Sequence, residues 1–173
     1  TPQPWLAEAW DTAAAGPDSL LLTFRLRRDV QWQDGRRTTA YDVAHTFGQA
    51  MDPRSGFVDA GALAPFAPVP EVVDSFTVRF RLRRHPDFME PFFLLPPLPA
   101  HVFGDTPAEG MARHAFGTSP VGNGPFRFTR RSSQEWVFDA NPDFPAALGG
   151  PPQLERLIYR AVPEQTSLVT EVL

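Results

Sequence analysis

The chain has 173 residues, of which 42% are hydrophobic, which is enough to bury one core, so a single domain over residues 1–173 is expected. Its 20 prolines exclude a helical bundle, a coiled coil and a helical solenoid, because proline lacks an N–H and clashes with the preceding helical turn. A net charge of −4 argues against nucleic-acid binding, and the absence of cysteine excludes a disulfide framework and a thiol nucleophile.

The first predicted features are two tryptophans and a strand. Trp5 and Trp10 are expected to pack in the core, since tryptophan buries a large apolar area. Within residues 20–28, apolar and polar types alternate from Leu22 onward, which predicts a half-buried strand. Its inward residues are Leu22, Phe24 and Leu26. Val30 and Trp32 are predicted to begin a second short strand before a turn at Asp34-Gly35.

The period then changes from two to 3.6. Apolar residues at helical spacing predict an amphipathic helix over residues 40–51. Thr39 is the expected N-cap, and Asp42 three residues later completes a capping-box pattern. Asp52-Pro53 ends the helix, because the residue before a proline is driven out of the helical region.

The rest of the chain is predicted to contain hairpins, short helices and proline-rich connections. The predicted elements are a loop at 54–70, a hairpin over 72–82 with its turn at Asp74-Ser75, short helices at 88–95 and 109–115, a hairpin formed by 125–130 and 135–140, a strand at 154–162 and a helix at 163–173. This order predicts an α+β fold built of antiparallel β-hairpins with short helices.

No catalytic, metal-binding or cofactor-binding pattern is present. The four histidines (His45, His85, His101 and His114) have no metal-ligand spacing, and neither a nucleophile elbow nor a phosphate-binding loop occurs. Phe24-Arg-Leu-Arg-Arg28 recurs as Phe80-Arg-Leu-Arg-Arg84, which could mark a nucleic-acid surface, but alternation and the acidic charge favour two solvated strand faces. The sequence contains no run of 18 apolar residues, so no membrane span is predicted. These residues indicate a binding module without enzymatic activity, cofactor or metal.

Several strings in order along the chain together resemble one family. They are Pro4-Trp-Leu-Ala-Glu-Ala-Trp10, Leu22-Thr-Phe-Arg-Leu-Arg27, Val30-Gln-Trp-Gln-Asp-Gly35, Thr39-Ala-Tyr-Asp-Val43, Val73-Asp-Ser-Phe-Thr-Val78, Val121-Gly-Asn-Gly-Pro-Phe126 and Asn141-Pro-Asp-Phe144. With them the chain resembles the extracellular solute-binding proteins of family 5, the dipeptide-, oligopeptide- and nickel-binding components of ABC importers. Gln33, Asn123 and Ala140 stand where the family usually has His, Thr and Arg.

The resemblance implies a two-lobe fold of the periplasmic-binding-protein type II kind, in which the lobes close on a ligand. It implies that residues 1–173 are a fragment of the N-terminal lobe, mostly its smaller subdomain, with the second lobe absent. Residues 154–173 are expected to begin the return to the main subdomain. The opening residues do not form a signal peptide, so the targeting segment is expected to be missing from this chain.

The resemblance also implies a function. The protein is expected to be the receptor of an ABC importer that captures a small peptide or similar solute and delivers it to the permease in the membrane. It would be periplasmic or extracellular, either lipid-anchored or soluble. The alternative is the ligand-sensing domain of a transcription regulator, because the same fold is joined to DNA-binding domains in some bacteria.

Two apolar segments are the candidates for ligand contact, because relatives direct side chains toward the ligand from these places. One is residues 54–66 after the predicted helix, and the other precedes Leu98-Pro-Ala-His101. The candidate residues are Phe57, Leu63 and Phe66 in the first segment and Leu95, Pro96 and Pro97 in the second. Arg54 and Asp59 are the nearest charges, which favours an uncharged or hydrophobic part of the ligand, such as a peptide side chain.

Overall fold

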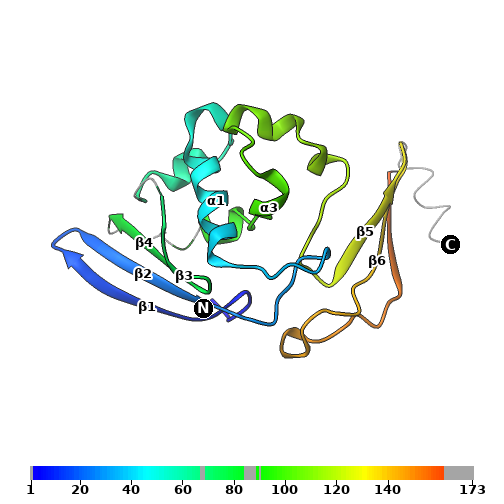
Figure 1. Ribbon diagram of the computed structural model, residues 1–173, viewed down its shortest axis with the longest axis horizontal. Helices are drawn as coiled ribbons and strands as arrows, with labels where there is room; N and C mark the ends of the chain where they lie inside the picture. Colours follow the sequence, from blue (N-terminus) through cyan, green and yellow to red (C-terminus); the bar gives the residue numbers. More distant parts are fainter. Residues whose placement is uncertain (1, 67–68, 84–88, 90, 162–173) are drawn as a thin grey trace. The chain divides into compact units, whose positions relative to one another are not determined.

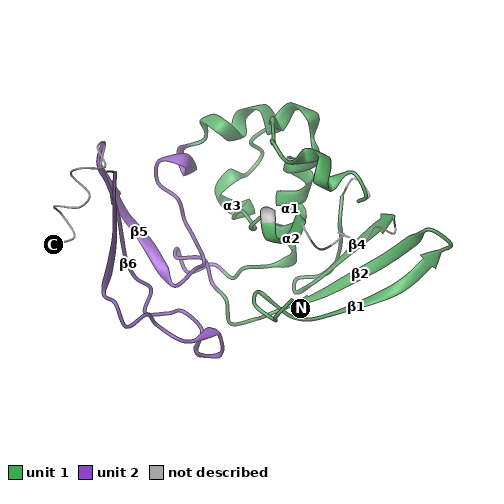
Figure 2. Cartoon of the chain, turned by 180° about the vertical axis from the view of Figure 1, so that it is seen from behind, with its two compact units in different colours: residues 1–30, 37–114 green, residues 31–36, 115–173 purple. Residues whose placement is uncertain are grey.

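A helix packed on one face of an antiparallel sheet organises the first part of the chain (Figure 1). The computed structural model describes residues 2–66, 69–83, 89 and 91–161. Contacts divide the chain into two units: unit 1 comprises 1–30 and 37–114, and unit 2 comprises 31–36 and 115–173 (Figure 2). Each unit has its own antiparallel sheet, so the predicted α+β class with antiparallel hairpins is confirmed.

The sheet of unit 1 has the strand order β1-β2-β4-β3. Its strands are β1 (Ala7–Gly16), β2 (Ser19–Leu26), β3 (Glu71–Asp74) and β4 (Thr77–Arg83). The alternation of β2 and β4 is confirmed, since Leu22 and Phe80 face the core and are almost fully buried. β1 was not predicted, because the run Ala13-Ala14 and its neighbours carry no alternation of apolar and polar residues. Its pairing with β2 supplies the backbone hydrogen bonds that hold it in place.

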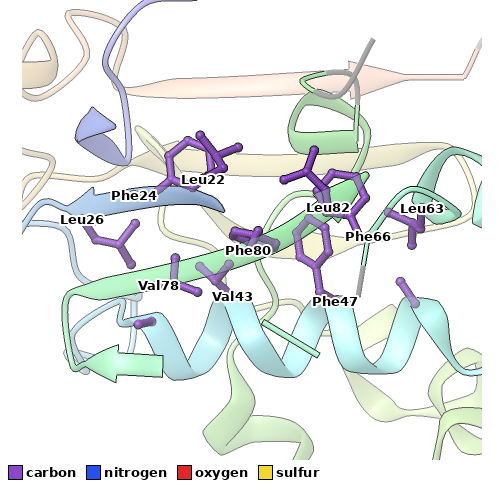
Figure 3. Close-up of a cluster of buried hydrophobic side chains, with 12 residues drawn as sticks. Leu22, Phe24, Leu26, Val43, Phe47, Leu63, Phe66, Val78, Phe80 and Leu82 are labelled. Atoms are coloured by element: carbon purple, nitrogen blue, oxygen red, sulfur yellow. The ribbon is translucent and has the colours of Figure 1, made fainter. Parts of the chain in front are cut away.

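Helix α1 (Ala40–Met51) has the predicted bounds. Its start is the predicted capping box, in which the Thr39 N–H donates to the Asp42 carboxylate at 2.8 Å. Its end is also as predicted, with Asp52 at the C-cap before Pro53. The inner side of α1 presents Phe47, which is 2% exposed, to β4 (Figure 3).

Five phenylalanines form the centre of the core between α1 and the sheet. They are Phe24, Phe47, Phe66, Phe80 and Phe92. Neighbouring ring centroids lie 4.8–5.9 Å apart, mostly edge-to-face or tilted, the arrangement that the ring quadrupoles favour. Because these rings come from the sheet, α1 and two later segments, the core fixes those segments against the sheet.

The remainder of unit 1 consists of short helical turns. They are the α-helices α2 (Pro91–Leu94) and α3 (Ala100–Phe103) and the 3₁₀ turns η1 (Pro53–Ser55), η2 (Ala60–Leu63) and η3 (Ala108–Arg113). The predicted loop at 54–70 therefore contains two 3₁₀ turns, and the predicted helix at 109–115 is a 3₁₀ turn that begins one residue earlier. Proline stands at or directly before the start of four of these turns, at Pro53, Pro91, Pro99 and Pro107, where its missing N–H is tolerated.

Unit 2 contains a three-stranded sheet in the order β5-β6-β7. Its elements are η4 (Ala115–Gly117), β5 (Phe126–Arg131), β6 (Glu135–Ala140), η5 (Ala146–Leu148) and β7 (Arg156–Arg160). The predicted hairpin and the strand after it are confirmed, with β7 shorter than the predicted 154–162. The predicted helix at 163–173 lies outside the described residues.

Two expectations were wrong. Trp5 is 58% exposed and does not belong to the core, whereas Trp10, which pairs with Phe24 across β1 and β2, packs against the core as expected. Val30 and Trp32 are buried but form no regular strand. The Trp32 N–H bonds to the Arg36 carbonyl across the Asp34-Gly35 turn, and this pairing is too short to extend beyond single bridge residues. Within the part of the chain that is described, no helix has the length and hydropathy needed to cross a bilayer.

Candidate functional site

The first candidate segment runs along the core after α1. Leu63, in η2, is 2% exposed, and Phe66 is 8% exposed with its ring against Phe47 and Phe80. Phe57 is half-buried and packs against the same cluster. The packing of unit 1 thus accounts for the burial of Leu63 and Phe66, and their contact with a ligand stays a prediction.

The second candidate segment reaches the same core. Leu95 is half-buried and packs against the core, Pro97 is half-buried, and Pro96 is exposed. Phe92 in α2, just before this segment, contacts Phe66 in the first one with ring centroids 5.6 Å apart. The structure therefore brings the two candidate segments to one apolar cluster, although nearly 30 residues of chain separate them.

Two exposed apolar residues in these segments were not singled out from the sequence. Val58 is 92% exposed next to Phe57, and Phe93 is 71% exposed next to Phe92. The pair Phe92-Phe93 carries a signal that could have been used: on a single helical turn, two consecutive side chains cannot both face the core. One ring of such a pair is left available for contact with another molecule.

A shallow pocket of about 430 Å³ lies on another part of unit 1, between the C-terminal half of α1 and the loop after α3. Its lining residues are His45, Gly48, Gln49, Asp52, Arg54, Gly104, Asp105, Thr106, Pro107 and Ala108. The Gln49 side-chain amide donates to the Thr106 carbonyl at 3.1 Å and holds the two walls together. None of the six predicted ligand residues lines this pocket.

The electrostatics of the pocket are dominated by one ion pair. The Arg54 guanidinium donates to both oxygens of the Asp52 carboxylate at 3.0 and 2.7 Å. Together with the Arg54 backbone N–H, it lowers the pKa of Asp52 to about 2. Arg54 also lies 3.6 Å from Glu109, so its charge is already shared between two carboxylates.

The described histidines take part in packing. Burial lowers the pKa of His45, against the smaller opposing effect of Asp42. The ring of His45 stacks on that of Phe103 with the centroids 5.9 Å apart. The ring of His114 also contacts Phe103, with the centroids 4.5 Å apart. His101 is half-buried in α3, and His85 lies outside the described residues. Among the residues with a described position, no group of three histidine or carboxylate side chains could hold a metal ion.

Two arginines of the first copy of the repeated pattern, and Arg79 directly before the second copy, have carboxylate partners. Arg25 lies 2.8 Å from Asp11, Arg79 lies 3.2 Å from Glu71, and Arg27 binds Asp29 at 2.7 Å. Glu71 and Asp29 are partners that sequence proximity indicates, whereas Asp11 is brought to Arg25 by the unpredicted strand β1. These pairs agree with a solvated strand face.

In unit 2 the strings that carry the family resemblance fasten loops to one another. Gln33, which replaces the usual His, donates from its side chain to the Phe126 carbonyl at 2.7 Å and accepts from the Gly122 N–H at 3.1 Å. Asn141, 4% exposed, donates to the Gly124 carbonyl at 3.0 Å. These residues therefore hold the fold together and do not indicate which ligand is bound.

Comparisons with known proteins agree on one family. Residues 1–173 match the bacterial extracellular solute-binding proteins, family 5 Middle. A Brucella ovis protein assigned to the ABC transporter peptide-binding proteins is 36% identical over 147 residues, which is 83% of this chain and 27% of the relative. Di/tripeptide-binding protein 2 of Pseudomonas aeruginosa is 33% identical over 178 residues, 90% of this chain and 32% of the relative.

Solved structures give the same result for the fold. The oligopeptide-binding protein AppA of Bacillus subtilis, in complex with a nonapeptide, superposes with a TM-score of 0.86 at 22% identity, over 97% of this chain and 33% of that one. A periplasmic oligopeptide-binding protein of Thermotoga maritima gives a TM-score of 0.76 at 27% identity, over 97% and 31%. The chain thus spans about a third of the length of the relatives that it matches. It belongs to the bacterial extracellular solute-binding proteins of family 5.

Proposed function

We propose that this chain is part of the receptor of an ABC importer, which captures a peptide-like solute outside the cytoplasmic membrane and delivers it to the permease. The observation that carries this proposal is the identity of 33–36% to peptide-binding relatives over more than four fifths of the chain. Two relatives are named for peptides, one of them for dipeptides and tripeptides. The named relatives are transporter proteins, which gives the transcription-regulator alternative no support.

We propose further that residues 1–173 form part of the N-terminal lobe of a two-lobe receptor, mostly its smaller subdomain. Residues 154–173 begin the return to the main subdomain. In this arrangement the ligand is held when a second lobe, elsewhere in the polypeptide, closes on the first. The protein acts as a binding protein without chemistry of its own, and it works in the periplasm or outside the cell, either lipid-anchored or free.

The ligand-facing part of unit 1 is proposed to lie at the two segments that meet on the phenylalanine core. The proposed contact residues are Phe57, Leu63, Phe66, Leu95, Pro96 and Pro97. Pro96 is exposed, as are Val58 and Phe93 near the other candidate residues in the sequence, so these segments offer apolar groups to a ligand. An apolar surface of this kind suits the side chains of a peptide better than its charged ends.

Mass spectrometry of the solute that co-purifies with the protein from its complete reading frame tests this proposal. The expected result is a set of short peptides, released when the protein is unfolded and absent from a mock purification. A co-purifying opine, sugar or metal chelate in place of peptides would contradict the proposed ligand class, while leaving the family assignment intact.

A further inference from the structure

We infer that Asp42 and Thr46 are positioning residues, which hold the proline-rich segment 95–100 in the conformation that faces the ligand. The inference rests on the proposed function, because Leu95, Pro96 and Pro97 are the proposed contact residues of this segment. It concerns two buried side chains of α1, of which the sequence predicted Asp42 only as the capping-box partner of Thr39 and assigned Thr46 no role beyond the helix.

The first observation is the burial of two polar side chains on the inner side of α1. Asp42 is 4% exposed and Thr46 is 2% exposed. A buried carboxylate or hydroxyl is costly unless its hydrogen bonds are satisfied. Both groups find their partners in segment 95–100: the Ala100 N–H donates to Asp42 Oδ1 at 2.8 Å, and the Leu98 N–H donates to Thr46 Oγ1 at 2.7 Å.

The second observation is a complete account of the backbone donors of the segment. Prolines 96, 97 and 99 have no N–H, so only residues 95, 98 and 100 can donate. The Leu95 N–H bonds to the Pro91 carbonyl at 3.0 Å in the last turn of α2. The other two donors are both taken by α1. The segment therefore has no donor left with which to join a sheet. At its end, where it enters α3 at Ala100, α1 supplies the acceptors for its last two backbone donors.

The third observation is that Asp42 links two structures at once. Its Oδ2 accepts from the N–H and the hydroxyl of Thr39 at the start of α1, while its Oδ1 holds Ala100. The Thr46 hydroxyl in turn donates to the Asp42 carbonyl at 2.7 Å. The position of the segment is thus coupled to the first turns of the helix through charge-assisted hydrogen bonds, which are stronger than neutral ones.

The functional consequence is preorganisation. Proline fixes φ, and the hydrogen bonds at Leu98 and Ala100 fix the end of the segment. Pro96 remains exposed between Leu95, which packs on the core, and these two bonds. A surface that is already ordered loses less conformational entropy when a ligand binds, and this raises affinity.

The test compares peptide affinity in single variants of the protein from its complete reading frame. Thr46→Val removes the acceptor of the Leu98 N–H at nearly unchanged shape, and Thr46→Ser retains the hydroxyl. Gln49→Met is the matched control, because it removes one hydrogen bond from the same helix to a different segment, the Thr106 carbonyl. Thr46→Ala replaces the valine variant if that variant does not fold.

The expected result is that Thr46→Val weakens the affinity for the best peptide of a panel about tenfold and accelerates hydrogen exchange at Leu98, whose N–H loses its acceptor. Thr46→Ser is expected to restore the affinity to within about twofold, and Gln49→Met to leave it unchanged although it loses similar stability. The positioning role alone would be overturned if Thr46→Val bound the peptide as tightly as the wild type, or if Gln49→Met lost as much affinity as Thr46→Val. Absence of peptide binding by the wild-type protein would overturn the proposed function and this inference with it.

Discussion

Single residues on the inner side of α1 divide into two kinds. Val43 and Phe47 meet the sheet through apolar contacts, while Asp42 and Thr46 meet the chain near residue 98 through hydrogen bonds. Both kinds are almost fully buried, but the cost of losing them differs in origin. An apolar residue loses packing and leaves a cavity, whereas a polar one leaves its partner without a hydrogen bond.

Replacing Phe47 with alanine tests the apolar part of this division. Phe47 is 2% exposed and its ring contacts the rings of Phe66, Phe80 and Phe92 in the core. We therefore expect Phe47→Ala to lower the free energy of unfolding by about 3–5 kcal/mol. Tyr41→Ala is the control, since Tyr41 is 59% exposed on the same helix and should cost less than about 1 kcal/mol. Urea unfolding followed by circular dichroism measures both values, and a cost for Phe47→Ala no larger than that of the control would contradict the assigned core.

His45 predicts a dependence of stability on pH. Burial lowers its pKa below the usual 6.5, so the unfolded chain takes up the proton first on acidification. The contribution of His45 is therefore fully favourable above about pH 6.5, and it declines as the pH falls from there toward the pKa of the folded state. His45→Phe keeps a ring against Phe103 but cannot titrate. Thermal unfolding at about pH 8 and about pH 5 should show a larger decrease for the wild type than for this variant; equal decreases would show that His45 does not contribute.

At the scale of elements, prediction from the sequence succeeded where one periodicity runs long enough. The helix over residues 40–51 and the inward faces of β2 and β4 follow directly from their apolar spacing. Strand β1 has an alanine-rich run with no such signal, and it is a strand because β2 offers it a pairing edge. Tertiary pairing of this kind lies outside any local pattern.

The candidate site was predicted in part for the same reason. The apolar character of the two segments can be read from composition, but their meeting on one core depends on contacts distant in sequence. The hydrogen bond between Leu98 and Thr46 joins residues 52 apart, and that between Ala100 and Asp42 joins residues 58 apart. Spacing along the chain cannot predict such contacts, and Leu63 and Phe66 therefore turned out to be core residues as well as candidates.

The arginine-bearing strands carry a prediction about nucleic acid. Arg25, Arg27 and Arg79 are paired with carboxylates, which lowers the free positive charge along β2 and β4, and the chain as a whole carries a net charge of −4. We expect no electrophoretic shift of single- or double-stranded DNA or RNA at physiological salt. Sub-micromolar binding that weakens steeply as salt is added would contradict the solvated-face interpretation and would give these arginines a recognition role.

At the scale of the whole molecule, the resemblance to family 5 extends over every part of the chain, while the chain spans about a third of each relative. The family strings that were recognised in the sequence hold loops and turns together, as Gln33 and Asn141 do in unit 2. They identify the fold with high specificity and say little about the solute. Peptide binding is therefore the part of the account that most needs a direct measurement.

Isothermal titration calorimetry measures peptide binding directly. A panel of dipeptides, tripeptides and oligopeptides is titrated into the protein from its complete reading frame and, separately, into residues 1–173 alone. Circular dichroism first establishes that each sample is folded. The account predicts saturable binding of at least one peptide class by the complete protein and none by residues 1–173, because a ligand held by two closing lobes needs both of them. Failure of the folded, ligand-free complete protein to bind any peptide would contradict the proposed receptor function, and tight binding by residues 1–173 alone would contradict the two-lobe arrangement.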